Sequence, residues 1–283
     1  MNLRVALICG RQGLTLLSAL PEILKGHTLR SFLSPAAWRD AQAQDSGLEL
    51  GSVCLPLPET GTFEDTLAGF RPDVILVMSY LGKLPPHLAR YTRFGMVNMH
   101  PSLLPQYRGA APIFHAIRDG AAVSGLTYHY LNDDFDAGPI IAQFPIKIQT
   151  QDCAQSLWLK INRRLLTTLP DLLECIETWA ERATPQDGAC ATSAPAPDLA
   201  LCRLSPTHTT MRNLRIIRAC TTIGGAVLED QAHGTIRVTT ATPDLHEALA
   251  SGNNQPLSLQ TRDGRLFLTS VHPISPVASM ALI

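Results

Sequence analysis

An amide, an imidazole and a carboxylate occur in this chain where they could together carry out acyl transfer. Asn98 and His100 lie two residues apart directly before Pro101, and Asp136 lies further along the chain before Gly138. Acyl transfer to an amine passes through an oxyanion, which needs hydrogen-bond donors, and releases a proton, which needs an acceptor. An amide or an imidazolium can be the donor, and a carboxylate can accept the proton and fix the imidazole tautomer. We therefore predict that Asn98, His100 and Asp136 are catalytic.

The predicted strand at 94–100 positions the first two of these residues. Side chains alternate along a strand, so Asn98 and His100 would share one face. Pro101 and Pro105 bound a segment that can neither continue the strand nor begin a helix, which predicts a loop at the strand's end. Ligands of open α/β sheets bind beyond the carboxyl ends of the strands. Taken singly, Asn98 could be a turn residue and His100 a buried structural histidine; only their combination with Asp136 indicates catalysis.

The first part of the chain, residues 1–183, has the pattern of a doubly wound α/β domain with a mainly parallel sheet. The apolar run at 74–78 has no polar face, which is typical of a central parallel strand covered by helices on both sides. Further strands are expected at 3–9, 29–33, 52–57, 126–131 and 140–148, and helices at 14–24, 63–70, 111–119 and 152–183, the last with a kink at Pro170. His129, in the strand at 126–131, is expected to be structural or exposed.

A glycine turn follows the first expected strand. Gly10 and Gly13 flank Arg11 there, and such a turn lets the backbone approach an anion at a helix N-terminus. The third glycine of a dinucleotide-binding fingerprint is missing. Arg11 is a candidate for contacting the substrate, and a tight turn without a ligand is an equal alternative.

A proline-rich segment divides the chain. Residues 184–206 contain four prolines among many Ala, Thr and Ser residues, which predicts a linker. After it, residues 207–283 read as a short helix followed by short strands at 226–228, 235–240, 257–261 and 265–271, with a hairpin turn at Asp263-Gly264. We expect a catalytic domain at 1–183, a linker at 184–206 and a smaller β-rich, barrel-like domain at 207–283.

Composition narrows the classes of partner and site. The 283 residues carry a net charge of −1, which provides no general attraction for nucleic acid. Seven cysteines occur without a C-x-x-C pair, so neither a disulfide framework nor a zinc site is indicated, and we expect no metal. The first strand is too short to span a membrane and lacks a signal-peptide pattern, which predicts a cytoplasmic protein without a membrane partner.

The run from Asn98 to Pro105, the Tyr107-Arg108-Gly109 that follows it and the loop with Asp136 resemble the signature of the 10-formyltetrahydrofolate-dependent formyltransferase family. This family includes methionyl-tRNA, glycinamide ribonucleotide and sugar-nucleotide formyltransferases. The resemblance implies a Rossmann-like catalytic domain, a C-terminal domain similar to an OB barrel, and 10-formyltetrahydrofolate as the formyl donor. It also implies that Asn98 and His100 contact the formyl oxygen and that Asp136 assists proton transfer.

The same resemblance predicts the binding residues. Two loops that hold the folate's pterin ring in the family match Leu81, Gly82, Lys83 and Leu84 on one side and Asp133, Asp134 and Phe135 on the other. For the acceptor substrate, the candidates are Arg11, Ser102, Tyr107 and Arg108.

The acceptor is predicted to be the primary amine of a small molecule, either an amino sugar nucleotide or a metabolite derived from an amino acid. The tRNA enzymes carry a basic, glycine-containing insertion that the corresponding segment, 34–44, lacks, and they usually have a small residue where this chain has Pro101. Transfer to methionyl-tRNA stays an alternative. So do hydrolysis of 10-formyltetrahydrofolate and a non-catalytic folate-binding role, and the oligomeric state, including a homodimer, is left open.

Overall fold

The computed structural model describes residues 1–43, 54–57, 60–251 and 256–273. The described residues form two compact units that each combine several chain segments. The first unit consists of 1–108, 125–146 and 160–193, and the second of 109–124, 147–159 and the described part of 194–283. None of the described helices is both long and apolar enough to cross a membrane.

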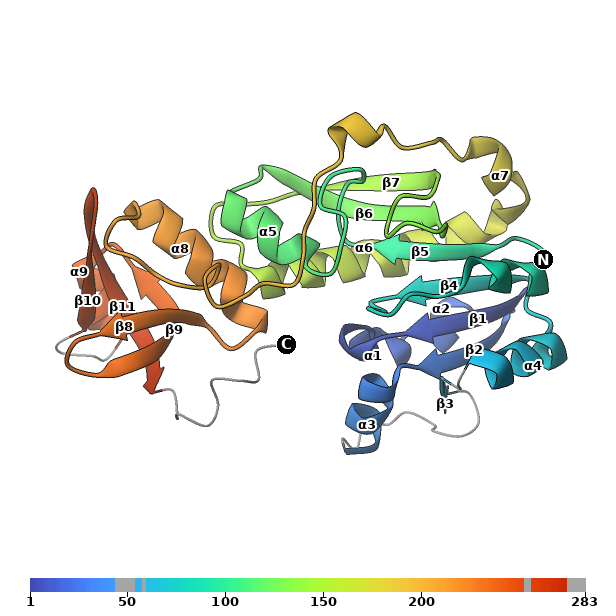
Figure 1. Ribbon diagram of the computed structural model, residues 1–283, viewed down its shortest axis with the longest axis horizontal. Helices are drawn as coiled ribbons and strands as arrows, with labels where there is room; N and C mark the ends of the chain where they lie inside the picture. Colours follow the sequence, from blue (N-terminus) through green and yellow to red (C-terminus); the bar gives the residue numbers. More distant parts are fainter. Residues whose placement is uncertain (44–53, 58–59, 252–255, 274–283) are drawn as a thin grey trace. The chain divides into compact units, whose positions relative to one another are not determined.

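A seven-stranded sheet with the order β3-β2-β1-β4-β5-β6-β7 organises the first unit (Figure 1). Its strands are β1 (Arg4–Cys9), β2 (Thr28–Leu33), β3 (Cys54–Pro56), β4 (Val74–Met78), β5 (Met96–His100), β6 (Val123–Tyr130) and β7 (Ile140–Lys147). β1 pairs in parallel with both β2 and β4, so the order of strands reverses between them. β5 continues the parallel arrangement next to β4 and pairs antiparallel with β6. The predicted doubly wound, mainly parallel sheet is confirmed.

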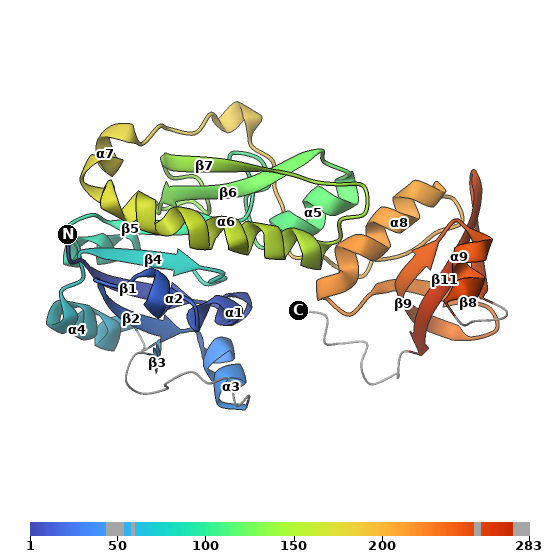
Figure 2. The ribbon, with the colours of Figure 1, turned by 180° about the vertical axis from the view of Figure 1, so that it is seen from behind.

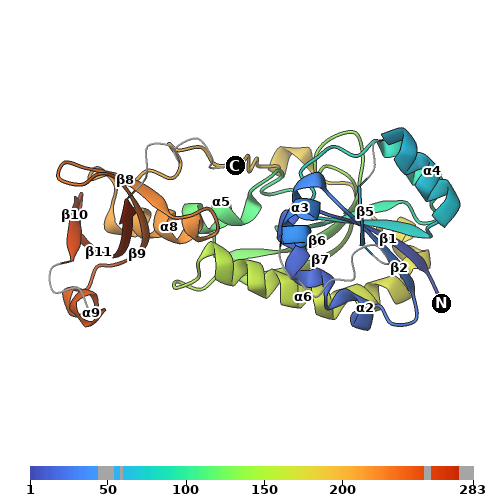
Figure 3. The same ribbon diagram turned by 90° about the horizontal axis from the view of Figure 1, so that it is seen from below.

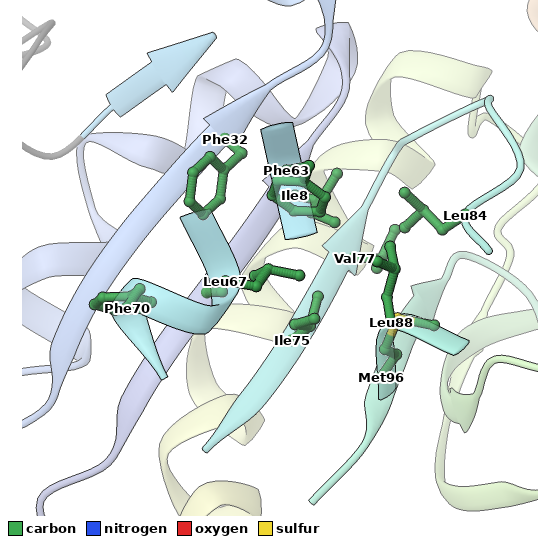
Figure 4. Packing of buried hydrophobic residues seen from close by; sticks show 11 residues of the cluster. Ile8, Phe32, Phe63, Leu67, Phe70, Ile75, Val77, Leu84, Leu88 and Met96 are labelled. Atoms are coloured by element: carbon green, nitrogen blue, oxygen red, sulfur yellow. The ribbon is translucent and has the colours of Figure 1, made fainter. Parts of the chain in front are cut away.

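Helices cover the two faces of this sheet. α4 (Thr60–Phe70) and α6 (Ala154–Glu174) lie on opposite faces (Figures 2 and 3). On the α4 side, Phe63, Leu67 and Phe70 pack against apolar side chains of the strands (Figure 4). Burial of each such side chain stabilises the fold by about 1.5–3 kcal/mol, so this core holds β4 and the start of β5 in place.

Two of the expected helices are shorter than the apolar pattern suggested. The helix predicted at 14–24 is divided into α1 (Leu14–Leu17) and α2 (Leu20–Ile23), because Pro21 in the first turn of α2 has no N–H to donate to an earlier turn. The helix predicted at 152–183 ends at Glu174, and the chain turns through a 3₁₀ helix into α7 (Trp179–Arg182). There the buried Trp179 indole donates to the Leu172 carbonyl over 2.9 Å and satisfies one carbonyl at the end of α6.

The remaining short elements of the first unit lie in its connections. They are α3 (Pro35–Ala43) and the 3₁₀ helices Arg11–Gly13, Pro86–Tyr91, Ile176–Thr178 and Gly188–Cys190. The strand predicted at 52–57 is described only from Cys54 onward, and the last residue of the segment 34–44 lies outside the described residues.

The second unit contains a curled antiparallel sheet with the order β10-β11-β9-β8. Its elements are α5 (Pro112–Asp119), α8 (Thr210–Ala219), β8 (Ala226–Asp230), β9 (Gly234–Thr242), α9 (Leu245–Ala250), β10 (Leu257–Thr261) and β11 (Gly264–Pro273), with a 3₁₀ helix at Cys220–Thr222. The predicted β-rich C-terminal part is confirmed. α9 was not expected, although Asp244 provides an N-cap whose side chain accepts from the His246 and Glu247 amides.

Candidate active site

Polar side chains at the end of β5 and from the neighbouring strand surround one carboxylate oxygen, Oδ1 of Asp136. Asn98 Nδ2 donates to it over 3.0 Å, and the Nδ1 atom of His100 lies 3.5 Å away. The Nε2 atom of His129 lies at the same distance of 3.5 Å. The structure therefore brings the three residues that the sequence predicted as catalytic into one cluster, and it adds His129 to them.

The register of two neighbouring strands explains this convergence. Asn98 and His100 lie two residues apart on β5 and therefore share a face. In the antiparallel pairing of β5 with β6, His129 lies directly opposite Asn98. His129 is 1% exposed, so the expectation that it could be an exposed residue is wrong. Sequence reasoning missed its position because the pairing of β5 with β6 was not known; that register is the signal that identifies it.

The backbone carbonyls around the cluster determine which ring nitrogens carry protons. His100 Nε2 lies 2.9 Å from the Tyr107 carbonyl oxygen, which can only accept, so Nε2 is protonated and Nδ1 faces Asp136. By the same reasoning, His129 Nδ1 donates to the Tyr130 carbonyl over 2.9 Å. The Nε2 atom of neutral His129 is then an acceptor, and it receives the second hydrogen of the Asn98 amide over 3.2 Å.

Burial sets the protonation state of His100. Removal of the ring from water lowers the pKa of His100 below its usual 6.5, and the Asp136 carboxylate and the bond to the Tyr107 carbonyl oppose this shift. His129 adds to the lowering. We conclude that His100 is neutral at pH 7 and that its Nδ1 atom can take up a proton beside Asp136.

Two residues of the site have left-handed backbone conformations. Asp136 has a φ of 53° and Tyr107 a φ of 59°. Aspartate adopts this region readily, whereas for a bulky residue such as Tyr107 it is an outlier that costs about 1–3 kcal/mol. Gly138 allows the Asp136 loop to approach β6, because a Cβ atom there would lie 1.8 Å from the Tyr130 carbonyl oxygen. The surrounding structure thus holds the Tyr107 loop in a conformation that it would not adopt alone, and it holds the Asp136 loop close to β6.

The candidate acceptor residues differ in how accessible they are. Ser102 is fully buried, and its hydroxyl donates to the Gln106 carbonyl over 2.7 Å, which favours a structural role within the loop. Arg108 is half-buried and donates from Nε and Nη2 to Gln186 Oε1, over 3.1 and 2.7 Å. Arg11 lies in the turn after β1 and forms an ion pair with Asp40. Of these, Arg108 is joined through Gln186 to the Asp136 loop.

The two candidate folate loops expose large apolar side chains. Leu81 is 70% exposed and Phe135 is 60% exposed, whereas Leu84 is buried in the core cluster and can offer only its backbone. Gly82, Lys83, Asp133 and Asp134 are exposed as well. Phe135 directly precedes Asp136 of the polar cluster, and an exposed aromatic side chain can stack on a flat ring. Within the described part of the chain, no group of three or more His, Cys, Asp or Glu side chains could hold a metal ion.

Known proteins match this chain in sequence and in fold. Residues 59–172 match the family described as Formyl transferase. The methionyl-tRNA formyltransferase of Anaplasma marginale is 39% identical over 133 residues, which are 47% of this chain and 44% of that protein. The chain thus spans less than half the length of the curated relatives it matches.

Two solved structures share the fold. HypX from Aquifex aeolicus, in complex with tetrahydrofolic acid, has a TM-score of 0.71 at 16% identity, covering 97% of this chain and 45% of that one. A sugar N-formyltransferase from a Shewanella species has a TM-score of 0.62 at 17% identity, covering 84% of this chain and 97% of that one. The segment 59–172 matched in sequence includes the whole cluster around Asp136. In sequence, this segment is similar to the family described as Formyl transferase and to methionyl-tRNA formyltransferases.

Proposed function

We propose that this protein transfers a formyl group from 10-formyltetrahydrofolate to the primary amine of a small molecule. The observation that carries the proposal is the convergence of Asn98, His100 and His129 on one oxygen of Asp136, within 3.0–3.5 Å. An amide donor, a protonatable imidazole and a carboxylate are the groups needed to stabilise an oxyanion and to take a proton from an amine.

The folate would be held by the loops that carry Leu81 and Phe135. When bound, it would supply the formyl carbon as the electrophile. Asn98 Nδ2 can donate to the formyl oxygen as negative charge develops on it if one of its two hydrogens then leaves Asp136 or His129. Loss of one such donor typically costs about 2.7–4 kcal/mol of transition-state stabilisation.

Asp136 and His100 handle the proton in this proposal. The Asp136 carboxylate accepts the proton that the attacking amine loses. The bond from the formyl carbon to N10 of the folate would then break, and N10 would take up a proton to leave as tetrahydrofolate. His100 Nδ1, 3.5 Å from Asp136 Oδ1, can share that proton, and as an imidazolium it becomes a second donor to the oxyanion. In neutral form it remains anchored through Nε2 to the Tyr107 carbonyl, so the ring need not move.

Arg108 supports an acceptor that carries an anionic group. Both of its bonds to Gln186 go to a neutral amide oxygen, which orients the guanidinium without neutralising its charge. A planar, oriented guanidinium suits a phosphate or a carboxylate. An amino sugar nucleotide and a metabolite derived from an amino acid both carry such a group.

A second candidate acceptor is methionyl-tRNA. It is favoured by one observation, namely that the sequence relatives with 34–39% identity are methionyl-tRNA formyltransferases.

Two further expectations stay predictions. One is the division of the chain into a domain at 1–183, a linker at 184–206 and a domain at 207–283. The other is a cytoplasmic location, and whether the protein forms a homodimer is left open.

The test is to incubate the protein with 10-formyltetrahydrofolate and to vary the acceptor. Amino sugar nucleotides, amino acids and methionyl-tRNA would be screened by mass spectrometry for the gain of one formyl group. The proposal expects formylation of a small amine by the wild type and, for Asp136→Asn, about a 10²–10⁴-fold loss of turnover with folate binding retained. Formate release without an amine would indicate a hydrolase instead. Failure to bind folate would exclude both formyl transfer and hydrolysis.

A further inference from the structure

The segment 184–193, predicted as the start of a linker, runs along both loops of the active site. Thr184 exchanges two backbone hydrogen bonds with Ile140, of 2.8 and 2.9 Å, just beyond the Asp136 loop. Thr192 bonds to the loop that follows β5. Residues 160–193 belong to the first compact unit, together with the catalytic cluster. The segment is therefore packed into the first unit.

Gln186 holds the loop that carries the catalytic carboxylate. Its Nε2 atom donates to the carbonyl oxygens of Asp136 and Gly138, each over 2.8 Å. One side-chain amide thereby fixes the backbone on both sides of Ala137. By fixing the backbone around Asp136, these two bonds help to keep the carboxylate aimed at Asn98 and His100.

The opposite end of the same amide holds Arg108. Gln186 Oε1 accepts from Arg108 Nε and Nη2, over 3.1 and 2.7 Å. The partners determine the orientation of the amide, because a flipped Gln186 would place its NH2 group against the guanidinium and its oxygen against two carbonyls. Gln186 is thus a direct mechanical link between Asp136 and the cation that we propose to bind the acceptor.

Thr192 holds the loop that anchors the catalytic imidazole. Its Oγ1 atom accepts from the Tyr107 amide over 2.8 Å, and its carbonyl accepts from the Arg108 amide over 2.8 Å. The carbonyl of Tyr107 is the acceptor that fixes the tautomer of His100. The conformation of Tyr107, with its φ of 59°, is therefore supported from outside the loop.

We propose that Gln186 is a positioning residue that couples the catalytic carboxylate of Asp136 to the acceptor-binding Arg108, and that Thr192 positions His100 through Tyr107. The proposal rests on the proposed formyl transfer. It makes the segment 184–193 part of the catalytic machinery. If Gln186 were merely structural, its replacement would change stability and the amount of active protein. It would not change kcat and KM to different extents, and it would not shift the pH profile.

Gln186→Glu separates the two functions of this side chain. The carboxylate can still accept from Arg108 but has no N–H for the carbonyls of Asp136 and Gly138. We expect kcat to fall about ten- to hundredfold, since small displacements of reacting groups cost this much. The KM for the acceptor should rise as well, because the new carboxylate neutralises the Arg108 guanidinium that we propose to bind the acceptor. The acidic limb of the kcat profile should also shift, because His100 would no longer be held at a fixed distance from Asp136.

Matched variants complete the experiment. Gln151→Glu introduces the same charge at an exposed glutamine outside the first unit and should leave both constants unchanged. Arg108→Gln should raise the KM for the acceptor with a smaller effect on kcat, so the fall in kcat is what reports on the bonds from Gln186 to the Asp136 loop. Thr192→Val removes the acceptor for the Tyr107 amide at equal volume, and it tests the proposal through the kcat profile even if Gln186→Glu does not fold.

Hydrogen exchange separates failure of this proposal from failure of the proposed function. If the wild type transfers no formyl group, the proposed function fails, but exchange of the amides at 134–138 still reports on positioning. Faster exchange there in Gln186→Glu, with the rest of the unit unchanged, supports the link. The proposal would be overturned if both Gln186→Glu and Thr192→Val showed the hydrogen exchange, kcat and pH profile of the wild type. It would also be overturned if a lower Tm explained the whole loss of activity.

Discussion

Asn98 and His129 lie directly opposite each other in the antiparallel pair of β5 and β6, and Asn98 Nδ2 is 3.2 Å from His129 Nε2. Because His129 Nδ1 donates to the Tyr130 carbonyl, Nε2 of the neutral ring can only accept. The Asn98 amide therefore points its NH2 group at Asp136 and His129. A flipped amide would bring its oxygen against a carboxylate and a ring lone pair.

Replacement of His129 should consequently weaken the hold on the orientation of the Asn98 amide. In His129→Leu the amide loses one acceptor and can rotate, so we expect kcat to fall about tenfold with little change in KM. His129→Gln, which retains an acceptor, should recover most of the loss. Steady-state kinetics of both variants and of their combinations with Asn98→Ala check this. Effects of His129→Leu and Asn98→Ala that simply add would contradict the relationship, since residues that act together are not additive.

Stability should depend on pH through His100. The pKa of buried His100 is lowered from 6.5, so below about pH 6.5 the unfolded chain binds this proton more readily than the folded protein. The stability that neutral His100 contributes is thus present above pH 6.5 and is lost as the pH falls through the lowered pKa, by at most about 1.4 kcal/mol per pH unit. Urea unfolding between pH 8 and 5.5 should show a steeper decline for the wild type than for His100→Asn. Parallel curves would show that His100 is not the group responsible.

The exposed apolar residues of the two candidate folate loops should contribute to ligand affinity rather than to stability. Phe135→Ala removes a ring that is 60% exposed, and we expect tetrahydrofolate to bind about tenfold more weakly with an unchanged Tm. Leu81→Ala should behave alike. The control is Leu159→Ala, a leucine 50% exposed that lies on α6. Calorimetric titration with tetrahydrofolate tests the expectation. It fails if Phe135→Ala and Leu81→Ala bind tetrahydrofolate as tightly as the wild type and the Leu159→Ala control do.

A methyl group at Gly138 should displace the catalytic loop. The added Cβ would lie 1.8 Å from the Tyr130 carbonyl, so the loop must move, at a cost of about 1–3 kcal/mol in unfolding free energy. Turnover should fall with it, because Asp136 lies two residues earlier. Gly69→Ala, in α4, is the control, since no atom lies within 4 Å of a Cβ atom built there. Equal behaviour of the two variants in unfolding and in kinetics would show that the close approach at Gly138 is unimportant.

Much of the fold could be predicted because its signals are local. The apolar run at 74–78 coincides with β4, and the strand expected at 94–100 contains β5 with Asn98 and His100 on one face. Helix lengths were less predictable. Pro21 divides the first helix by removing a backbone donor, and the long helix ends early at Glu174, where the buried Trp179 folds back onto it. These ends depend on contacts that periodicity does not contain.

By itself, the sequence determined that an amide, an imidazole and a carboxylate would be available beyond the end of a parallel strand, because alternation along β5 and the prolines after it are properties of adjacent residues. Only the tertiary structure decided what surrounds them. His129 joins the site through the pairing of β6 with β5, and Gln186 through a return of the chain 50 residues after Asp136. Both depend on hydrogen bonds between distant segments, which neither composition nor spacing can specify.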